Sequence, residues 1–511
     1  MVTRPDRRIA LLAFAATLVA GACSPAPSPT GPPSPTGALA AATASTAAGS
    51  AAPTSAAASP APSSSPMPST QPMVPGWSYT AEGSFSDVQF ARDGSVVTIE
   101  SKADSSARVV RLAPDGTVGW SWAEPGMSAA WVAMAPDGSL DVVAGVPSGT
   151  STEWAESLHR LTTFGKEAPG FPVALPSGNV CSMALAGDGT TFVTCRDTNA
   201  STLKSTVTAV GPDGRVLAGW PVPIDGGGDI AGVRPDGSIV LDVAAGDDTK
   251  IVTTVVALGR DGMPVPGWHV GSFGDSATVA VDALGRVIVV DHANLEGECG
   301  AFKTTTYAIL GSDGGAASGW PVTIRGWPTH PVIRADGSLV VAGSGGRMLA
   351  WSGWGAALPG WPASGVDVSM GCFLGSNPVA AGDGGVLLVG ARRATLFTAG
   401  GADMAGWPVT VPDNVARTCT GCTEGLEGPV DPSVAGDVLY LPTYQGSAPD
   451  GFGGQPRIVA LDRQGKPRAS LSRRIGAPGD VIQWIRTAPD GRVWVELSGA
   501  TAQSLVLITD S

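Results

Sequence analysis

The sequence has few charged residues and few of the side chains that most often carry catalysis. Of its 511 residues only 15% are Asp, Glu, Lys or Arg, and only 4 are His. It contains no G-x-S-x-G turn, no H-E-x-x-H pair and no phosphate-binding loop of the G-x-x-x-x-G-K-[ST] type. It therefore carries no signature of an α/β-hydrolase, a zinc peptidase or a nucleotide hydrolase, and we expect no catalytic residue and no metal ligand.

Positive charge is also scarce, and the formal net charge is -13. A chain this acidic is repelled by phosphate backbones and by anionic lipid headgroups. The composition therefore argues against nucleic acid and against an anionic membrane surface as partners. In contrast, the chain holds 70 Gly and 43 Pro, which suits a fold that turns often.

The first 22 residues have the layout of an export signal. Arginines within residues 4–8 precede an apolar run at 9–19, which is too short to span a bilayer as a mature helix. The small residues 20–22 then lead directly to Cys23, as in the lipobox of bacterial lipoproteins. We expect removal of residues 1–22, lipidation of Cys23 and an extracytoplasmic, membrane-anchored protein. An ordinary secretory signal with a chance cysteine is the alternative.

Residues 23–73 are a low-complexity segment of Ala, Ser, Pro, Thr and Gly, without a charge or an aromatic ring. Such a segment cannot bury enough apolar surface to offset the entropy of ordering it. We expect a disordered or polyproline-like tether, which could reach on the order of 150 Å at about 3.1 Å per residue. The folded domain should therefore span residues 74–511.

Within residues 74–511 the sequence repeats with a period near that of propeller blades, on the order of 50 residues. Each unit contains an apolar run, a turn of the Asp-Gly type and a second apolar run, which predicts a β-hairpin. Nine such turns occur, at Asp93, Asp137, Asp188, Asp236, Gly285, Asp336, Asp383, Asp437 and Asp490.

A second signal in most units is a short strand, a turn and a G-W-P-V motif, as at Trp220 and Trp320. Each unit thus supplies four strands, which we call a, b, c and d, and the sequence predicts an all-β, single β-propeller of nine antiparallel blades, with eight as the alternative. The end at Ser511 matches a strand c, and residues 74–80 match the missing strand d. We expect the two termini to close the ring, and each repeated Trp to pack against the neighbouring blade.

Three units resemble the PQQ-like repeats of quinoprotein alcohol dehydrogenases: PVIRADGSLVVAGSGGRMLAWS, NPVAAGDGGVLLVG and DPSVAGDVLYLPT. A fourth, DSATVAVDALGRVIVVDHAN, is similar to an NHL repeat. The resemblance implies a propeller, and its family includes both quinone- and calcium-dependent dehydrogenases and non-enzymatic envelope lipoproteins. The dehydrogenases usually carry two adjacent cysteines, which this sequence lacks. We expect no cofactor, with PQQ and calcium as the alternative.

Six cysteines follow Cys23, and an even number in an exported chain favours disulfides. Cys181 and Cys195 lie symmetrically about the turn at Asp188, so we expect them to be bridged across that hairpin. The others should lie on the face formed by the b–c and d–a loops, where a four-cysteine zinc site is the alternative to bridges. These others are Cys299, Cys372, Cys419 and Cys422.

Polar and aromatic residues recur near the start of strand a, where the sequence predicts the mouth of a central channel. We interpret this ring as the candidate binding site, and it comprises Asp87, Trp131, His330, Asn377, Asp431 and Trp484. The leading hypothesis is a monomeric envelope lipoprotein whose propeller binds a protein, peptide or glycan and meets the membrane only through its lipid. The alternative is an extracytoplasmic enzyme, either a quinone-dependent dehydrogenase or a hydrolase or lyase acting on carbohydrate.

Overall fold

The computed structural model describes most of the chain from Ser78 onward, and residues Val74–Ser511 form one compact unit. Across this described part, no helix is long and apolar enough to cross a lipid bilayer. The described residues are 78–81, 83–147, 154–176, 180–197, 203–247, 250–268, 271–274, 277–296, 301–325, 329, 331–343, 347–364, 369–370, 373–374, 377–390, 393–411, 430–445, 454–499 and 502–508.

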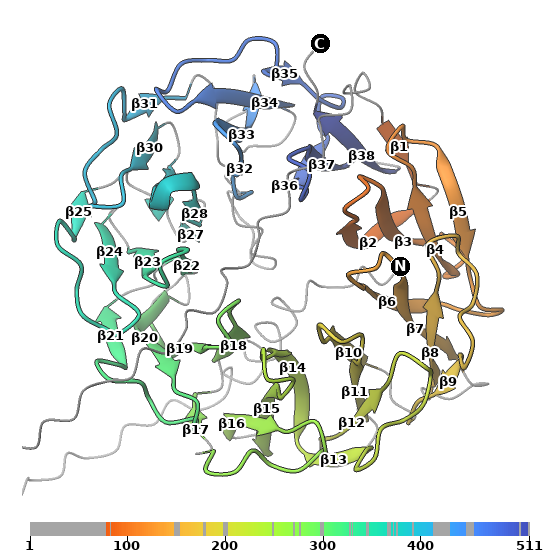
Figure 1. Cartoon of the computed structure of the whole chain (residues 1–511). Helices are drawn as coiled ribbons and strands as arrows, with labels where there is room; N and C mark the ends of the chain where they lie inside the picture. Colours follow the sequence, from red (N-terminus) through yellow and green to blue (C-terminus); the bar gives the residue numbers. More distant parts are fainter. Residues whose placement is uncertain are drawn as a thin grey trace, which may run out of the picture. The chain divides into compact units, whose positions relative to one another are not determined.

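Nine four-stranded antiparallel sheets follow one another around a ring, and the first strand of each lies nearest the axis (Figure 1). Blades 1 to 3 contain β2 (Ser84–Phe90), β3 (Val96–Ser101), β4 (Ala107–Leu112), β5 (Val118–Trp122); β6 (Ala129–Met134), β7 (Leu140–Pro147), β8 (Trp154–Leu161), β9 (Val173–Ala174); β10 (Val180–Leu185), β11 (Thr191–Asp197), β12 (Lys204–Val210), β13 (Val222–Asp225). Blades 4 to 6 contain β14 (Gly227–Val233), β15 (Ile239–Asp247), β16 (Lys250–Leu258), β17 (Gly271–Phe273); β18 (Thr278–Val281), β19 (Val287–Glu296), β20 (Ala301–Leu310), β21 (Val322–Arg325); β22 (Val332–Ile333), β23 (Leu339–Ala342), β24 (Arg347–Trp351), β25 (Ala363–Ser364).

The last three blades follow the same plan. They contain β28 (Val379–Ala380), β29 (Val386–Val389), β30 (Arg393–Phe397), β31 (Val409–Thr410); β32 (Ser433–Ala435), β33 (Val438–Gln445), β34 (Gln455–Asp462), β35 (Arg473–Arg474); β36 (Val481–Thr487), β37 (Val493–Ser498), β38 (Gln503–Ile508), β1 (Ser78–Thr80). Between blades 6 and 7 the chain adds a short hairpin of β26 (Ser369–Met370) and β27 (Phe373–Leu374). The predicted nine-bladed propeller is confirmed, and the alternative of eight is wrong.

The ring closes by pairing the two ends of the propeller. Strand β1 lies antiparallel to β38, with Tyr79 opposite Leu505. The hydroxyl of Tyr79 also donates to the carboxylate of Glu100 in blade 1, at 3.2 Å. The N-terminal strand therefore joins the last blade and contacts the first, as the sequence predicts.

The repeated Asp holds most of the a–b turns together. In blade 2, Oδ1 of Asp137 accepts the hydroxyl of Ser139 at 2.6 Å and its backbone N–H at 2.9 Å. These hydrogen bonds hold the pKa of Asp137 below its usual value. Gly138 has φ 83°, a left-handed conformation in which a residue with a Cβ is strained. The Asp-Gly pair is thus explained by the turn itself.

Arginines link several of these turns to the blade before them. Arg160 binds Asp141 of its own blade at 2.6 Å and donates to the carbonyl of Gly189, in the a–b turn of blade 3, at 2.8 Å. The acceptor is the backbone carbonyl of the turn's glycine, so the contact does not depend on a side chain of the turn. The same arrangement joins Arg111 with Gly138, Arg234 with Gly285, Arg286 with Gly337, and Arg334 with Gly384.

The tryptophan of the G-W-P motif packs between blades, as predicted. Trp220 is buried in a core shared by blades 3 and 4, and its Nε1 donates to the carbonyl of Arg260 in the c–d turn of blade 4, at 2.9 Å. Trp268 departs from this pattern, because it donates to Val255 of its own blade. The inter-blade bond recurs for Trp120 with Thr163, Trp320 with Gly353, Trp361 with Ala399, and Trp407 with Arg463.

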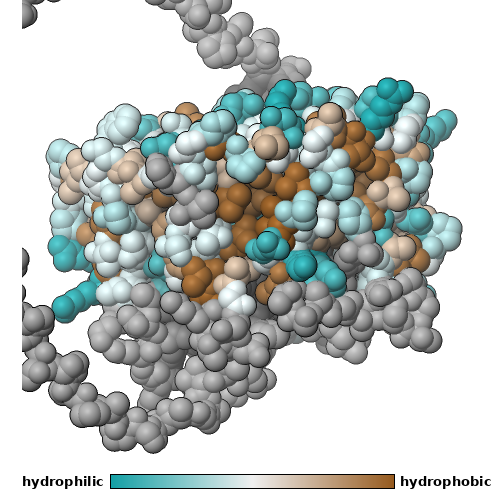
Figure 2. Space-filling model, turned by 90° about the horizontal axis from the view of Figure 1, so that it is seen from below, coloured by the Kyte–Doolittle hydropathy of each residue, from teal (hydrophilic) through white to brown (hydrophobic). Residues whose placement is uncertain are grey.

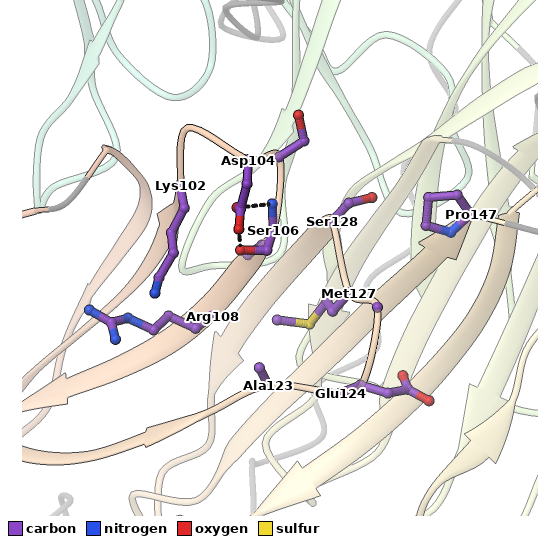
Figure 3. A pocket seen from close by; sticks show the side chains of 12 residues that line it. Lys102, Asp104, Ser106, Arg108, Ala123, Glu124, Met127, Ser128 and Pro147 are labelled. Atoms are coloured by element: carbon purple, nitrogen blue, oxygen red, sulfur yellow. Dashed lines mark hydrogen bonds between the residues drawn. The ribbon is translucent and has the colours of Figure 1, made fainter.

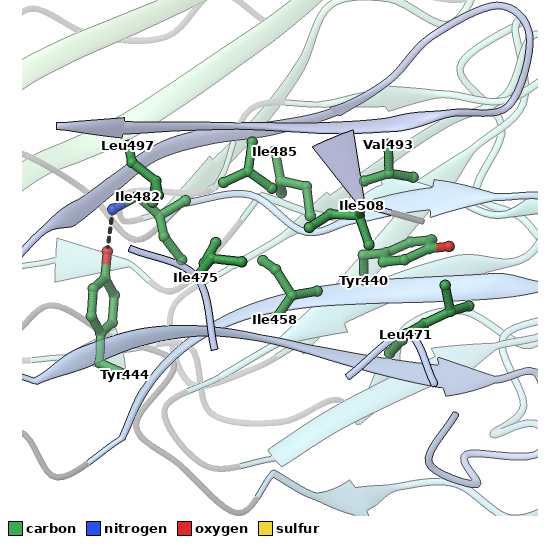
Figure 4. Packing of buried hydrophobic residues seen from close by; sticks show 12 residues of the cluster. Tyr440, Tyr444, Ile458, Leu471, Ile475, Ile482, Ile485, Val493, Leu497 and Ile508 are labelled. Atoms are coloured by element: carbon green, nitrogen blue, oxygen red, sulfur yellow. Dashed lines mark hydrogen bonds between the residues drawn. The ribbon is translucent and has the colours of Figure 1, made fainter. Parts of the chain in front are cut away.

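The hydrophobic core is divided into clusters, most of which lie between neighbouring blades. Figure 4 shows one of them, in which Tyr440 and Ile458 of blade 8 face Ile485 and Val493 of blade 9. Figure 2 views the rim along the side that lies lowest in Figure 1, where apolar side chains gather among polar ones. The blades are therefore stabilised by apolar contacts with their neighbours, as repeat proteins require.

Candidate functional site

The six residues of the predicted ring do not lie at one level. Asp87 and Trp484 lie in the middle of the innermost strands β2 and β36, whereas Asn377 and Asp431 precede β28 and β32. The difference arises because the innermost strands begin at different points and have different lengths. His330 lies outside the described residues.

Two members of the ring bind each other across blades 7 and 8. The backbone N–H of Asn377 donates to Oδ1 of Asp431 at 2.8 Å, and the side-chain amide donates to Oδ2 at 3.0 Å. A third member, Trp131, is only 8% exposed and belongs to the core between blades 2 and 3. Asn377, Asp431 and Trp131 therefore all take part in contacts between neighbouring blades.

The strongest chemistry near the axis is on blade 9. Arg486 lies over the ring of Trp484, with its guanidinium carbon 4.8 Å from the ring centroid. Directly opposite Trp484 on β37 is Glu496, which is buried and hydrogen-bonded to that Trp. Burial raises the pKa of Glu496 to about 7. This carboxyl can therefore exchange a proton near neutral pH, beside an exposed cation and a half-buried ring.

The innermost strands of blades 9 and 1 both carry a β-bulge. In β36 the register shifts between Ile482 and Trp484, and in β2 it shifts between Ser86 and Gln89. Asp87, inside the second bulge, has φ 49°. Bulges re-aim side chains and are common beside functional sites, and a left-handed non-Gly residue stores strain that is also common there. We call Asp87, Trp484, Arg486 and Glu496 the axial site.

A third bulge, on β14 of blade 4, adjoins a pair of carboxyls. Asp229 lies directly opposite Asp242 on β15, and the register shifts after Ile230. Arg196 of blade 3 binds Asp229 at 2.6 Å. Burial, with the adjacent charge of Asp229, raises the pKa of Asp242 to about 7. The Asp242 carboxyl can therefore exchange its proton near neutral pH.

A hollow of about 500 Å³ lies on the loop face between blades 1 and 2 (Figure 3). The b–c loop of blade 1 and the segment that leads into blade 2 form its walls. In Figure 3, Lys102 and Arg108 lie on one side and Glu124 on the other. Its lining comprises Lys102, Asp104, Ser105, Ser106, Ala107, Arg108, Ala123, Glu124, Gly126, Met127, Ser128 and Pro147.

The carboxylate of Glu124 belongs to a hydrogen-bonded cluster with side chains of strand β8 in blade 2. Its Oε2 lies 2.9 Å from the hydroxyl of Ser157 and 3.2 Å from Nε2 of His159. Nδ1 of the same buried imidazole lies 3.1 Å from Glu167, and its ring centroid lies 4.6 Å from that of Trp122. The cluster joins the end of blade 1 to strands of blade 2 and fixes the position of the Glu124 carboxylate.

Cys181 and Cys195 face each other across the hairpin of β10 and β11, and a disulfide joins them. The remaining candidate cysteines, Cys23, Cys299, Cys372, Cys419 and Cys422, lie outside the described residues. Within the described ranges, no three His, Cys, Asp or Glu side chains are grouped so as to hold a metal ion.

No family model matches the chain, and no curated protein matches it. Among solved structures, it is similar to the β-propeller domain of the trilobed protease from Pyrococcus furiosus, at 9% identity and a TM-score of 0.36, over 75% of this chain and 96% of that one. A putative TolB from Agrobacterium tumefaciens is 14% identical with a TM-score of 0.29, over 48% and 82%. The chain spans 63% of a eukaryotic initiation factor, at 10% identity, a TM-score of 0.37 and 53% of its own length. Likenesses this distant say nothing about activity.

Sequence reasoning found Asp87 and Trp484 but missed their neighbours and the cluster behind the hollow. Glu124 and His159 come from different blades and have no motif spacing between them. The available signal was weak: His159 is one of only 4 histidines, and its strand also holds Glu156, Ser157 and Arg160. Its contact with Glu124 depends on which strands of neighbouring blades face each other.

Proposed function

We propose that this protein is an exported lipoprotein, anchored through Cys23, whose monomeric propeller binds a protein, peptide or glycan outside the cytoplasm. Two features of the sequence support the anchor, namely the small residues 20–22 before Cys23 and the uncharged segment up to residue 73. The observation that carries the binding role is the axial site. There, two neighbouring innermost strands bulge; one carries Asp87, and the other carries Trp484 with Arg486 over its ring.

Binding is tested with the full mature chain on immobilised peptides and glycans. A ligand that binds the wild type should bind Arg486→Gln about tenfold more weakly, because a hydrogen bond to a charged group contributes about 1.5–3 kcal/mol. Arg486 is exposed, so the substitution leaves the core intact. Trp354→Ala is the control, since Trp354 is 76% exposed on an outer turn of blade 6. Equal binding by Arg486→Gln and the wild type would disprove the axial site.

The anchor has its own test. The wild type should take up labelled fatty acid and fractionate with membranes, whereas Cys23→Ala should do neither. If the variant remains in the membrane fraction, the lipid anchor is wrong, although the binding role would be unaffected.

A further inference from the structure

The hollow between blades 1 and 2 is separate from the axial site and has its own charge balance. Arg108, on one wall, is neutralised by the buried carboxylate of Glu100 at 2.8 Å. Lys102, beside it, attracts the exposed carboxylate of Asp104. Hydrogen bonds from Ser106 lower the pKa of Asp104 most, and the charge of Lys102 lowers it further. The two cations of the lining therefore already face carboxylates.

The opposite wall carries negative charge in excess. Glu124 lies there with its side chain 30% exposed, and a second carboxylate, Glu167, stands on the far side of His159. The imidazole of His159 lies between these two carboxylates, and the chain as a whole has a formal net charge of -13. The field of such a wall attracts cations and steers them towards it.

Glu124 is also held in one position before a ligand arrives. Its Oε2 contacts Ser157 and His159, and His159 is only 4% exposed. These contacts involve one carboxylate oxygen, which leaves Oε1 as an acceptor on a carboxylate whose orientation is fixed. A receiving group that is fixed in advance loses little entropy on binding.

We propose that this hollow binds a cationic side chain of a peptide, with Glu124 as the carboxylate that receives its ammonium or guanidinium group. The proposal rests on the proposed role of the propeller as a binding scaffold and specifies one peptide chemistry for it. Ser105 is exposed and lines the same hollow, so its hydroxyl can bond the peptide backbone. A volume of about 500 Å³ lies within the usual range of ligand sites, roughly 300–1,000 Å³.

The probe is a fluorescein-labelled trilysine amide, and its anisotropy is measured with the full mature chain in detergent. Glu124→Gln should bind the probe about tenfold more weakly than the wild type, because a charge-assisted hydrogen bond is lost. Ser157→Ala should weaken binding less, since it only loosens the carboxylate. Asp403→Asn is the matched control, an exposed carboxylate in an outer turn of blade 7, and should bind like the wild type. Wild-type affinity should fall as salt is added.

Two results would overturn the proposal: no binding of the probe to the wild type, or equal binding by Glu124→Gln and the wild type. Arg486→Gln separates this site from the axial site. It should keep full affinity for trilysine while losing the ligand of the axial site. Failure of trilysine binding alone would leave the axial site standing, and failure of the axial site alone would leave this one.

Discussion

Replacing Gly219 with Ala should destabilise the propeller much more than the same substitution at Gly267. Both glycines precede the tryptophan of a G-W motif, in blades 3 and 4, and both have left-handed backbones, with φ 89° and 74°. A Cβ at Gly219 would lie 1.9 Å from the carbonyl oxygen of Asp261 in the next blade. A Cβ at Gly267 would meet nothing within 4 Å. Comparing the two variants therefore separates the cost of backbone strain from the cost of disturbing the contact between blades.

The expected magnitudes follow from these two surroundings. Left-handed strain costs about 1–2 kcal/mol at either site. At Gly219 the turn that contains Asp261 must also move, and overpacking of this kind costs about 1–3 kcal/mol. The same movement weakens the bond from Trp220 to Arg260, which contributes about 1 kcal/mol. The Gly219 variant should thus lose about 3–6 kcal/mol and the Gly267 variant about 1–2 kcal/mol.

Thermal melts of the two variants beside the wild type measure the difference. The wild type should melt highest, Gly267→Ala slightly lower and Gly219→Ala lowest. A further variant, Trp220→Phe, removes the indole N–H and part of the buried ring, and should fall between the wild type and Gly219→Ala. If the two alanine variants melt together, the glycine serves its own turn alone, and the contact between Gly219 and Asp261 contributes nothing to blade packing.

Three further predictions concern closure, a buried carboxyl and the disulfide. Deleting residues 1–82 removes β1, whereas deleting residues 1–73 does not. The longer deletion should lower the free energy of unfolding by about 4 kcal/mol more. Roughly three hydrogen bonds to β38 contribute about 1 kcal/mol each, and burial of Tyr79 contributes about 1.5 kcal/mol. Equal melting temperatures would refute closure by β1. Asp242 has a pKa of about 7 in the folded state and about 3.9 in the unfolded state, so the folded state binds the proton more tightly. As the pH rises from about 3.9 to about 7, the folded protein therefore loses about 1.4 kcal/mol of stability for each pH unit. Asp242→Asn should remove that loss, so its advantage over the wild type should be larger in melts at pH 8 than at pH 4. Peptide mapping without reductant should recover Cys181 linked to Cys195, and a free thiol at either would contradict the bridge.

The fold could be predicted from the sequence because each blade repeats its own local chemistry. The pair Asp137–Gly138 specifies a tight turn through bonds within three residues, so its recurrence counts the hairpins directly. The packing role of Trp220 was also predictable, because a large ring at one fixed place in each unit must meet the next unit. The exception at Trp268 depends on its particular neighbours, and the sequence pattern does not reveal it.

The candidate sites were only partly predictable, because they depend on contacts between blades. The sequence pattern placed Trp484 and Asp87 near the start of strand a, whereas both lie in the middle of their strands. The sequence pattern did not indicate that a bulge would displace each of them or that Glu496 would lie behind the indole. The bond between Glu124 and His159 joins two blades across 35 positions of sequence, and it follows only from which strands face each other.

Residues that recur at the same place in many blades cannot be the ones that recognise a ligand, because the blade itself already uses them. The Asp of the turn accepts hydrogen bonds within the turn, the Trp donates to the next blade, and arginines such as Arg160 bind the carbonyl of the next turn. Function must therefore lie where the repeat is broken. The bulged innermost strands of blades 1 and 9 break it at Asp87 and Trp484. Glu124, between blades 1 and 2, is another such place. Its hydrogen bond to His159 is neither one of the turn contacts nor one of the tryptophan contacts that the blades share. Both proposed sites thus lie where the blades depart from the contacts that they share.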